Sequence, residues 1–262
     1  MLPLSETVLL TLASLVIGGI GPLSLFIIYI YSKPHLIALF LVSSLASLFG
    51  FIVTAVIWRI SMNSMDIGYF AVFGSFIQEC CRYYLINSIY RTVEIKYNKS
   101  YLTAVNRDGN DFFILTDLSS SVASGVGFGF MKTLLIFGNV ITKCIQSDSY
   151  AKSLNLFEKS PNVPTLIGLS IISCFYFILD FILMPIAFHA NKAQNKYLHF
   201  LIFFLRISAT SFMFFNKIEN GFFISLGGIS FIIFLSFLLL VRLDPLTKNK
   251  IQKDENSTIT VH

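Results

Sequence analysis

SGVGFGFMKT, residues 124–133, places Gly125, Gly127 and Gly129 at alternate positions and follows them with Lys132, all inside a long apolar run. Alternate glycines suggest a flexible or nucleotide-binding loop, but the apolar residues on both sides favour a helix. Successive residues turn by about 100° around a helix axis, which gives the glycines a regular arrangement on its surface. We therefore interpret this stretch as the middle of a transmembrane helix.

Small residues form a stripe along one face of this expected helix. The stripe repeats every four residues and consists of Ser121, Gly125, Gly129 and Thr133. Such a spacing lets helix backbones approach closely in lipid. Lys132 lies about 20° from Gly125 around the helix, so the face that packs closely also carries a charge. Gly127 lies on the opposite face, where it can serve a second neighbouring helix.

The composition of the whole chain indicates a membrane protein. Of its 262 residues, 55% are hydrophobic and 13% are charged, whereas soluble domains carry about 25% charged residues. A spanning helix needs about 20 mostly apolar residues, and seven segments qualify: 7–30, 36–58, 67–90, 115–141, 164–188, 197–216 and 220–241. We therefore expect an all-α, polytopic fold, in which residues 1–241 form a seven-helix transmembrane domain and residues 242–262 a polar cytosolic tail.

Basic residues between these segments indicate the orientation, because lysine and arginine accumulate in cytosolic loops. With the N-terminus outside, eleven basic residues are cytosolic: Lys33, Arg91, Lys96, Lys99, Arg107, Lys192, Lys196, Arg242, Lys248, Lys250 and Lys253. Five fall on the other side: Arg59, Lys143, Lys152, Lys159 and Lys217. This excess predicts a lumenal or extracellular N-terminus and a cytosolic C-terminus. The N-glycosylation sequences at Asn98 and Asn256 should then stay unmodified.

Six polar residues interrupt the expected spans: Gln78, Glu79, Arg82, Lys132, Asp180 and Arg206. Ionisable groups at membrane depth usually face the bundle interior or a water-filled cavity. Glu79 and Arg82 are three residues apart and share one helix face. Their spacing fits either local neutralisation that helps insertion or a polar contact with another helix.

Depth along the helices suggests how the other three charges are arranged. A helix rises 1.5 Å per residue, which places Asp180 roughly 12 Å and Arg206 roughly 14 Å from the cytosolic ends of their spans. The similar depths favour an ion pair, which either holds the helices together or lines a functional cavity. Lys132 is roughly 26 Å from the cytosolic start of its span. We therefore expect it to be too far from Asp180 to bond, and either to snorkel outward or to meet a polar group in the outer half.

The sequence contains no recognisable catalytic or metal-binding constellation. Intramembrane aspartyl cleavage needs two carboxylates that share a site, and Asp180 is the only aspartate deep inside an expected span. The chain has no His-Glu-x-x-His string, no serine–histidine dyad and no phosphate-binding loop. Its four cysteines lack metal-ligand spacing, so we interpret them as small apolar packing residues. We expect no enzymatic activity, no metal, no cofactor and no nucleic-acid partner.

Several motifs carry a resemblance to a known family. They are GPLSLF at 21–26, Pro34 followed by a span that ends in Trp58, QExxR at 78–82, and the stretch at 124–133. Over roughly residues 15–216 the chain resembles the anterior-pharynx-defective (Aph) family, the seven-span scaffold subunit of gamma-secretase. The family has Gly-x-x-x-Gly-x-x-x-Gly in its fourth span, and here Thr133 replaces the third glycine. Its characteristic histidines in the fifth and sixth spans align with Asp180 and Arg206, an ion pair that would not titrate near neutral pH.

The resemblance implies a non-catalytic subunit that nucleates assembly with nicastrin and then holds presenilin and the presenilin enhancer subunit. In the family the presenilin C-terminus enters a cavity within the Aph bundle, and a carboxylate arriving here would meet a net basic interior. The resemblance also implies a role in processing type I membrane proteins such as Notch and the amyloid precursor. The expected location is the endoplasmic reticulum, the Golgi and the plasma membrane.

Two other classes of membrane protein share some of these features. A seven-span receptor usually has an acidic-Arg-aromatic triplet after its third span and NPxxY in its last, where this chain has NSIYRTVE and FLLLVRLDPL. A small transporter would also carry charges inside the membrane, but inverted repeats and broken helices are not recognisable in this sequence. Both classes stay as alternatives, and a native gel in mild detergent distinguishes them from a subunit of a large complex.

Overall fold

The computed structural model describes residues 4–61, 67–90, 117–146, 165–217 and 221–259. In these ranges the chain has helices joined by short turns at 31–33 and 193–195 and has no strand, which confirms the all-α expectation. The α-helices are α1 (Leu4–Leu25), α2 (Pro34–Ser61), α3 (Ile67–Tyr84), α5 (Asp117–Gln146), α7 (Thr165–Lys192), α8 (Lys196–Ser211) and α9 (Gly221–Ile259). Short helices of other types extend three of them: π-helices η1 (Phe26–Ile30) and η2 (Leu85–Tyr90) follow α1 and α3, and the 3-10 helix η3 (Phe212–Lys217) follows α8.

Each α-helix overlaps one of the seven expected segments. Five spans are long and apolar enough to cross a membrane, and they are formed by α1 with η1, α2, α7, α8 with η3, and α9. The other two α-helices, α3 and α5, carry Glu79, Arg82 and Lys132, and these charged side chains lower their hydropathy. The seven crossings therefore stay a prediction. Helix α9 also continues to Ile259, through most of the segment that we expected as a polar tail.

Local sequence explains several helix boundaries. Pro34 is the first residue of α2, a position where its missing amide hydrogen removes no helical hydrogen bond. Gln194 adopts a left-handed conformation with φ 50 after α7 and turns the chain back. The side chain of Asn195 then caps α8 by accepting hydrogen bonds from the amides of Tyr197 at 3.1 Å and Leu198 at 3.3 Å. The connection between α7 and α8 is therefore short and ordered.

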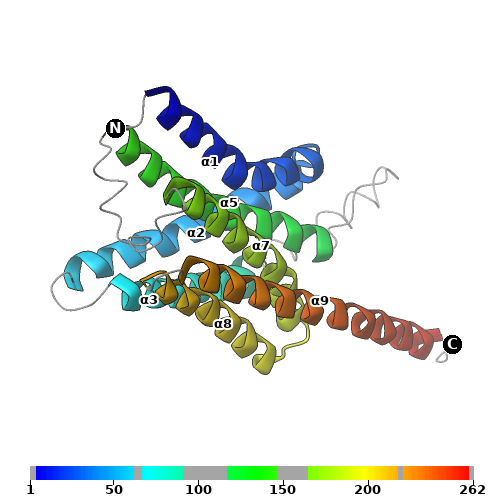
Figure 1. Cartoon of the computed structure of the whole chain (residues 1–262). Coiled ribbons are helices and arrows are strands. Elements are labelled where there is room, and N and C mark those ends of the chain that lie inside the picture. The colour runs from blue at the N-terminus through cyan, green and yellow to red at the C-terminus, as the bar shows by residue number, and fades with distance from the viewer. Residues whose placement is uncertain (1–3, 62–66, 91–116, 147–164, 218–220, 260–262) are drawn as a thin grey trace.

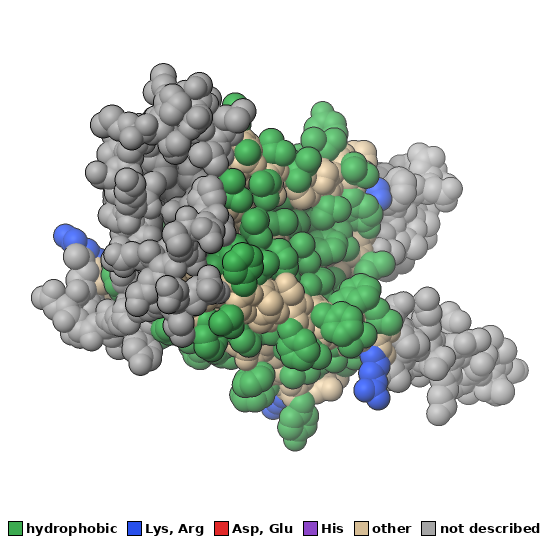
Figure 2. Space-filling model, in the orientation of Figure 1, with side chains coloured by type: hydrophobic (Ala, Val, Ile, Leu, Met, Phe, Trp, Pro, Cys, Tyr) green, Lys and Arg blue, Asp and Glu red, His purple; other side chains and the backbone are tan. Residues whose placement is uncertain are grey.

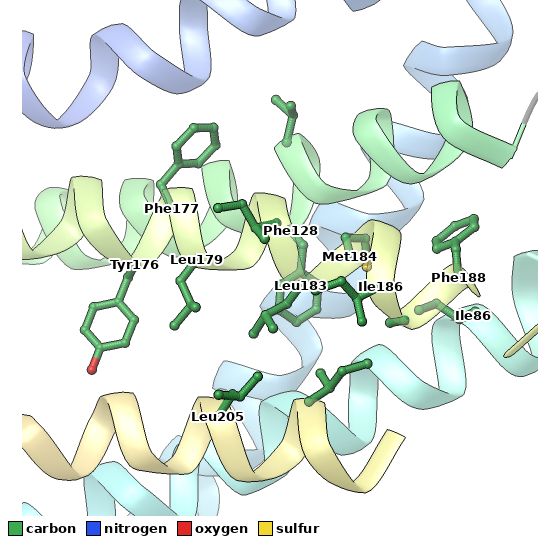
Figure 3. Packing of buried hydrophobic residues seen from close by; sticks show 14 of the residues in the cluster. Ile86, Phe128, Tyr176, Phe177, Leu179, Leu183, Met184, Ile186, Phe188 and Leu205 are labelled. Atoms are coloured by element: carbon green, nitrogen blue, oxygen red, sulfur yellow. The ribbon is translucent and has the colours of Figure 1, made fainter. Parts of the chain in front are cut away.

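Helix α7 is the central element of the bundle (Figure 1). Its spanning segment is 67% buried, whereas those of α1 and α9 are 22% buried. It packs against α1, α5, α8 and α9, and α5 in turn packs between α7 and α2. Figure 3 shows Tyr176 and Leu179 pointing from α7 toward α8, while Phe177 points to the opposite side. Side chains on all faces of α7 are therefore available to build an interior site.

The outer surface is mainly apolar. Figure 2 shows hydrophobic side chains across the middle of the visible face, with lysine and arginine only toward its margins. Large side chains of α2 and α9 are exposed, including Phe49 at 61% and Phe223 at 62%. A soluble monomer rarely exposes so continuous an apolar surface, and lipid tails can cover it.

Candidate functional site

Five ionisable side chains meet inside the bundle. Glu79 and Arg82 come from α3, Lys132 from α5, Asp180 from α7 and Arg206 from α8, and each is at most 5% exposed. We call these residues the charge cluster. Four helices contribute to it, so the cluster joins segments that are distant in the sequence.

Asp180 is the central acceptor of the charge cluster. Its Oδ1 accepts a hydrogen bond from Nη2 of Arg82 and lies 3.1 Å from Nη1 of Arg206. Its Oδ2 accepts a hydrogen bond from Nζ of Lys132 at 2.7 Å. The expected pairing of Asp180 with Arg206 is therefore present, but it is one of three ion pairs on a carboxylate that is 0% exposed.

Glu79 supplies the second carboxylate. Its Oε1 lies 3.2 Å from Nη1 of Arg82 on the same helix and 3.9 Å from Nε of Arg206. Both contacts of Glu79 Oε1 are ion pairs by distance, but neither has the geometry of a hydrogen bond. Arg82 consequently does both things that its sequence spacing allowed: it neutralises Glu79 within α3, and it contacts Asp180 on α7.

The expectation that Lys132 is too far from Asp180 is wrong, because the two are hydrogen-bonded. The helix ends explain the error. Helix α7 runs to Lys192, beyond the expected end of its span at 188, and α5 begins at Asp117 rather than at 115. Counted from these ends, the two depths agree to within about 5 Å. The long side chain of lysine can cover the remaining offset.

Two aromatic rings cover the cationic side chains. The ring of Phe128 lies 4.9 Å from the guanidinium of Arg82 and 5.4 Å from Nζ of Lys132. The ring of Tyr176 lies 4.8 Å from the guanidinium of Arg206, and its hydroxyl donates to the carbonyl of Ala209 at 3.1 Å. The faces of aromatic rings attract cations, most strongly where water is excluded. Sequence reasoning missed both rings, although Phe128 precedes Lys132 by four residues on the same helix face.

The glycines of α5 bring two neighbouring helices close to the charge cluster. A Cβ added at Gly125 would lie 3.2 Å from Cβ of Met184, and one at Gly129 would lie 2.7 Å from the ring of Phe177, both on α7. On the opposite side, a Cβ at Gly127 would clash with Ser43 and with the carbonyl of Phe40 on α2. The remaining stripe residues bond within α5: Ser121 donates to Leu118 at 2.8 Å and Thr133 to Gly129 at 3.0 Å.

The comparison with protein families identifies the chain. The model of the family described as Aph-1 protein matches residues 10–243, which include all five members of the charge cluster. The chain belongs to the Aph-1 family. This confirms the resemblance seen in the sequence. A search of curated proteins found no match.

Family membership sets the broad role of this Aph-1 protein. Aph-1 proteins form the gamma-secretase subunit family, a family of non-catalytic subunits. The apolar helices agree with a membrane protein. Among the described residues, no group of histidine, cysteine, aspartate and glutamate side chains could hold a metal ion.

A cavity of about 230 Å³ borders the charge cluster of this Aph-1 protein. Its walls come from α2, α3, α5, α7, α8 and η3, and Lys132, Arg206 and Gln78 are among the lining residues. Gln78 donates from Nε2 to the carbonyl of Ser47 at 3.3 Å, which ties α3 to α2. Next to it, the hydroxyls of Ser75 and Thr210 are hydrogen-bonded at 2.7 Å and join α3 to α8. The cavity is therefore lined by both polar and apolar side chains and lies where five α-helices meet.

Proposed function

We propose that this protein is the non-catalytic scaffold subunit of a gamma-secretase complex, with nicastrin, presenilin and the presenilin enhancer subunit as its partners. In this role it supports assembly of the complex and the processing of type I membrane proteins such as Notch and the amyloid precursor. The proposed location is the endoplasmic reticulum, the Golgi and the plasma membrane. Helix α1 would start on the lumenal or extracellular side, and α9 would end in the cytosol.

The bonding of the charge cluster is the observation that supports a scaffold. Both carboxylates are paired with cations, and the ion pairs cross-link α3, α5, α7 and α8. An acid–base dyad would instead need two carboxylates that share a proton. Breaking a buried ion pair is costly, so these bonds favour one fixed arrangement of the helices. A fixed arrangement suits a subunit whose task is to present surfaces to partners.

Purification from native membranes in a mild detergent tests the assignment. The tagged full chain should migrate in a large complex on a native gel, and mass spectrometry should find presenilin, nicastrin and the presenilin enhancer subunit in it. Migration of the chain without partners would contradict the proposal and favour the transporter or receptor alternative.

Variants of the charge cluster test its contribution to partner binding. In the proposed complex, the C-terminus of presenilin enters the cavity that Lys132 and Arg206 line. We expect Lys132→Leu and Asp180→Leu to lower the recovery of presenilin, whereas Lys196→Leu, at an exposed position on α8, should leave it unchanged. Size-exclusion chromatography of each variant separates lost binding from misfolding. Full recovery with both cluster variants would show that the cluster does not shape the presenilin site.

A further inference from the structure

Helices α3 and α5 differ from the other α-helices in how well they suit lipid. In the part of the chain that the structure describes, five spans are long and apolar enough to cross a membrane, and neither helix belongs to them. Each of the two carries a buried basic side chain, Arg82 in α3 and Lys132 in α5. A lysine or arginine at membrane depth opposes the insertion of its helix into a bilayer. Both helices therefore need a source of negative charge.

The two helices obtain this negative charge in different ways. In α3, Glu79 lies three residues before Arg82, and its Oε1 is 3.2 Å from Nη1 of Arg82. In α5, the one acidic residue is the first, Asp117, at the start of the helix rather than near Lys132. The carboxylate that Lys132 contacts belongs to α7, because Nζ donates to Oδ2 of Asp180 at 2.7 Å. Lys132 is therefore neutralised across a helix interface and not within its own helix.

The interface between α5 and α7 combines this charge pair with close packing. Gly125 and Gly129 both approach α7, and Lys132 follows Gly125 by two helical turns on the same face. Helix α7 is apolar enough to cross a membrane even with Asp180 inside it, since its span has a mean hydropathy of 2.2. The dependence is therefore one-sided: α5 needs the charge of α7, whereas α7 has the apolar character to enter lipid by itself.

We propose that α5 crosses the bilayer only together with α7, because Asp180 supplies the negative charge that Lys132 needs at membrane depth. The chain is made from its N-terminus, so α5 is made before Asp180, and its position becomes final once α7 follows. The inference concerns the path of the chain through the membrane and not only the stability of the folded bundle. It goes beyond the proposed scaffold function and shares with it the expectation that α5 is a membrane span.

Glycosylation acceptors on the two sides of α5 show whether it crosses. Two full-length chains are made, one with an acceptor sequence between residues 91 and 116 and one with an acceptor between 147 and 164. The native acceptors at Asn98 and Asn256 are replaced by glutamine in both chains. Whichever orientation the wild-type protein has, we expect one acceptor of the pair to be modified and the other to stay unmodified. Cell-free translation with microsomes reads each chain as it is made, so a variant that does not fold stays measurable.

Removal of the charge pair in two steps isolates the contribution of Asp180. In Asp180→Leu, which makes α7 only more apolar, the fraction of chains whose α5 crosses should fall by about half or more, because Lys132 loses its counter-charge. The two acceptors should then lie on the same side. In Lys132→Leu/Asp180→Leu, crossing should return to the wild-type level, although Arg82 and Arg206 still lack the carboxylate of Asp180. Such a recovery reports the insertion of α5 and not a repair of the fold.

A packing variant is the control. Phe177→Ala removes the ring that packs beside Gly129 but keeps both charges, so α5 should cross as in the wild-type chain even where the fold is weaker. Wild-type crossing in Asp180→Leu, or no recovery in the double variant, overturns the inference and leaves the scaffold assignment intact. Equal modification of both acceptors in the wild-type chain would show that α5 does not cross, and this result overturns the inference together with the seven-span topology.

Discussion

Asp180 shows how one residue can determine the interior of this Aph-1 protein. An ionised carboxylate at this depth is unfavourable by itself, but Asp180 receives hydrogen bonds from Arg82 and Lys132 and an ion pair from Arg206. Each cation comes from a different helix. Loss of the single negative charge would therefore leave three buried cations with Glu79 as their one remaining carboxylate.

We expect Asp180→Asn to destabilise the fold by about 3–5 kcal/mol, the range for breaking a buried ion pair. Glu79→Gln serves as the matched comparison, because it also removes one carboxylate charge but loses only the ion pairs with Arg82 and Arg206. Its effect should be smaller. Thermal unfolding in mild detergent measures both. Equal stability of the two variants would contradict the central role of Asp180.

At the scale of elements, α5 is packed closely on two sides. Gly125 and Gly129 face α7, and Gly127 faces α2. Pro185 lies inside α7 and has no amide hydrogen to donate to the carbonyl of Phe181. A Cβ added at Gly125 would lie 3.3 Å from that carbonyl. Gly125 thus lets the backbone of α5 approach α7 at the carbonyl of Phe181, which receives no helical hydrogen bond from Pro185.

Gly127→Ala should destabilise the fold by about 1–3 kcal/mol, the usual cost of inserting a methyl group into a packed interior. The added methyl would meet Ser43 and the backbone of Phe40, and the helix backbone cannot move as a flexible side chain does. Gly138→Ala is the control on the same helix, because an added Cβ there meets no atom within 4 Å. We expect the control to be neutral or slightly stabilising, as alanine favours helix over glycine. Thermal unfolding that ranks Gly138→Ala as the more harmful change would contradict this packing.

At the scale of the whole molecule, α1 begins and α9 ends at opposite ends of the bundle (Figure 1). An odd number of crossings places the two ends of a chain on different sides of a membrane. The excess of basic residues in alternate connections favours the cytosol for the end of α9. Apolar side chains on the outward faces of α2 and α9 suit contact with lipid.

An engineered glycosylation sequence tests this orientation. Placed before α1, it should be glycosylated in microsomes, whereas the same sequence placed after α9 should not. The native sequences at Asn98, which lies outside the described residues, and at Asn256, within α9, should stay unmodified. Glycosylation only after α9 would reverse the orientation, and glycosylation at both ends would exclude an odd number of crossings.

Local patterns by themselves determined much of this protein. The seven helical segments, the pairing of Glu79 with Arg82 and the two glycine faces of α5 all follow from apolar length and from the helix period, which are properties of a short segment. The family was also recognisable from short motifs. Such features need no knowledge of where other helices lie.

Only the tertiary structure decided which charges meet. Depths counted along separate spans placed Lys132 too far from Asp180 to bond, yet the two are hydrogen-bonded. The errors in the ends of the two helices add up in their relative depth, and the long lysine side chain covers the distance that remains. The ring of Tyr176 against Arg206 and the cavity beside them likewise had no local signal. The sequence alone therefore determined the helices and the presence of charges within them. The packing of four helices around Asp180 determined how those charges are paired, because contact depends on relative position in space and not on spacing along one chain.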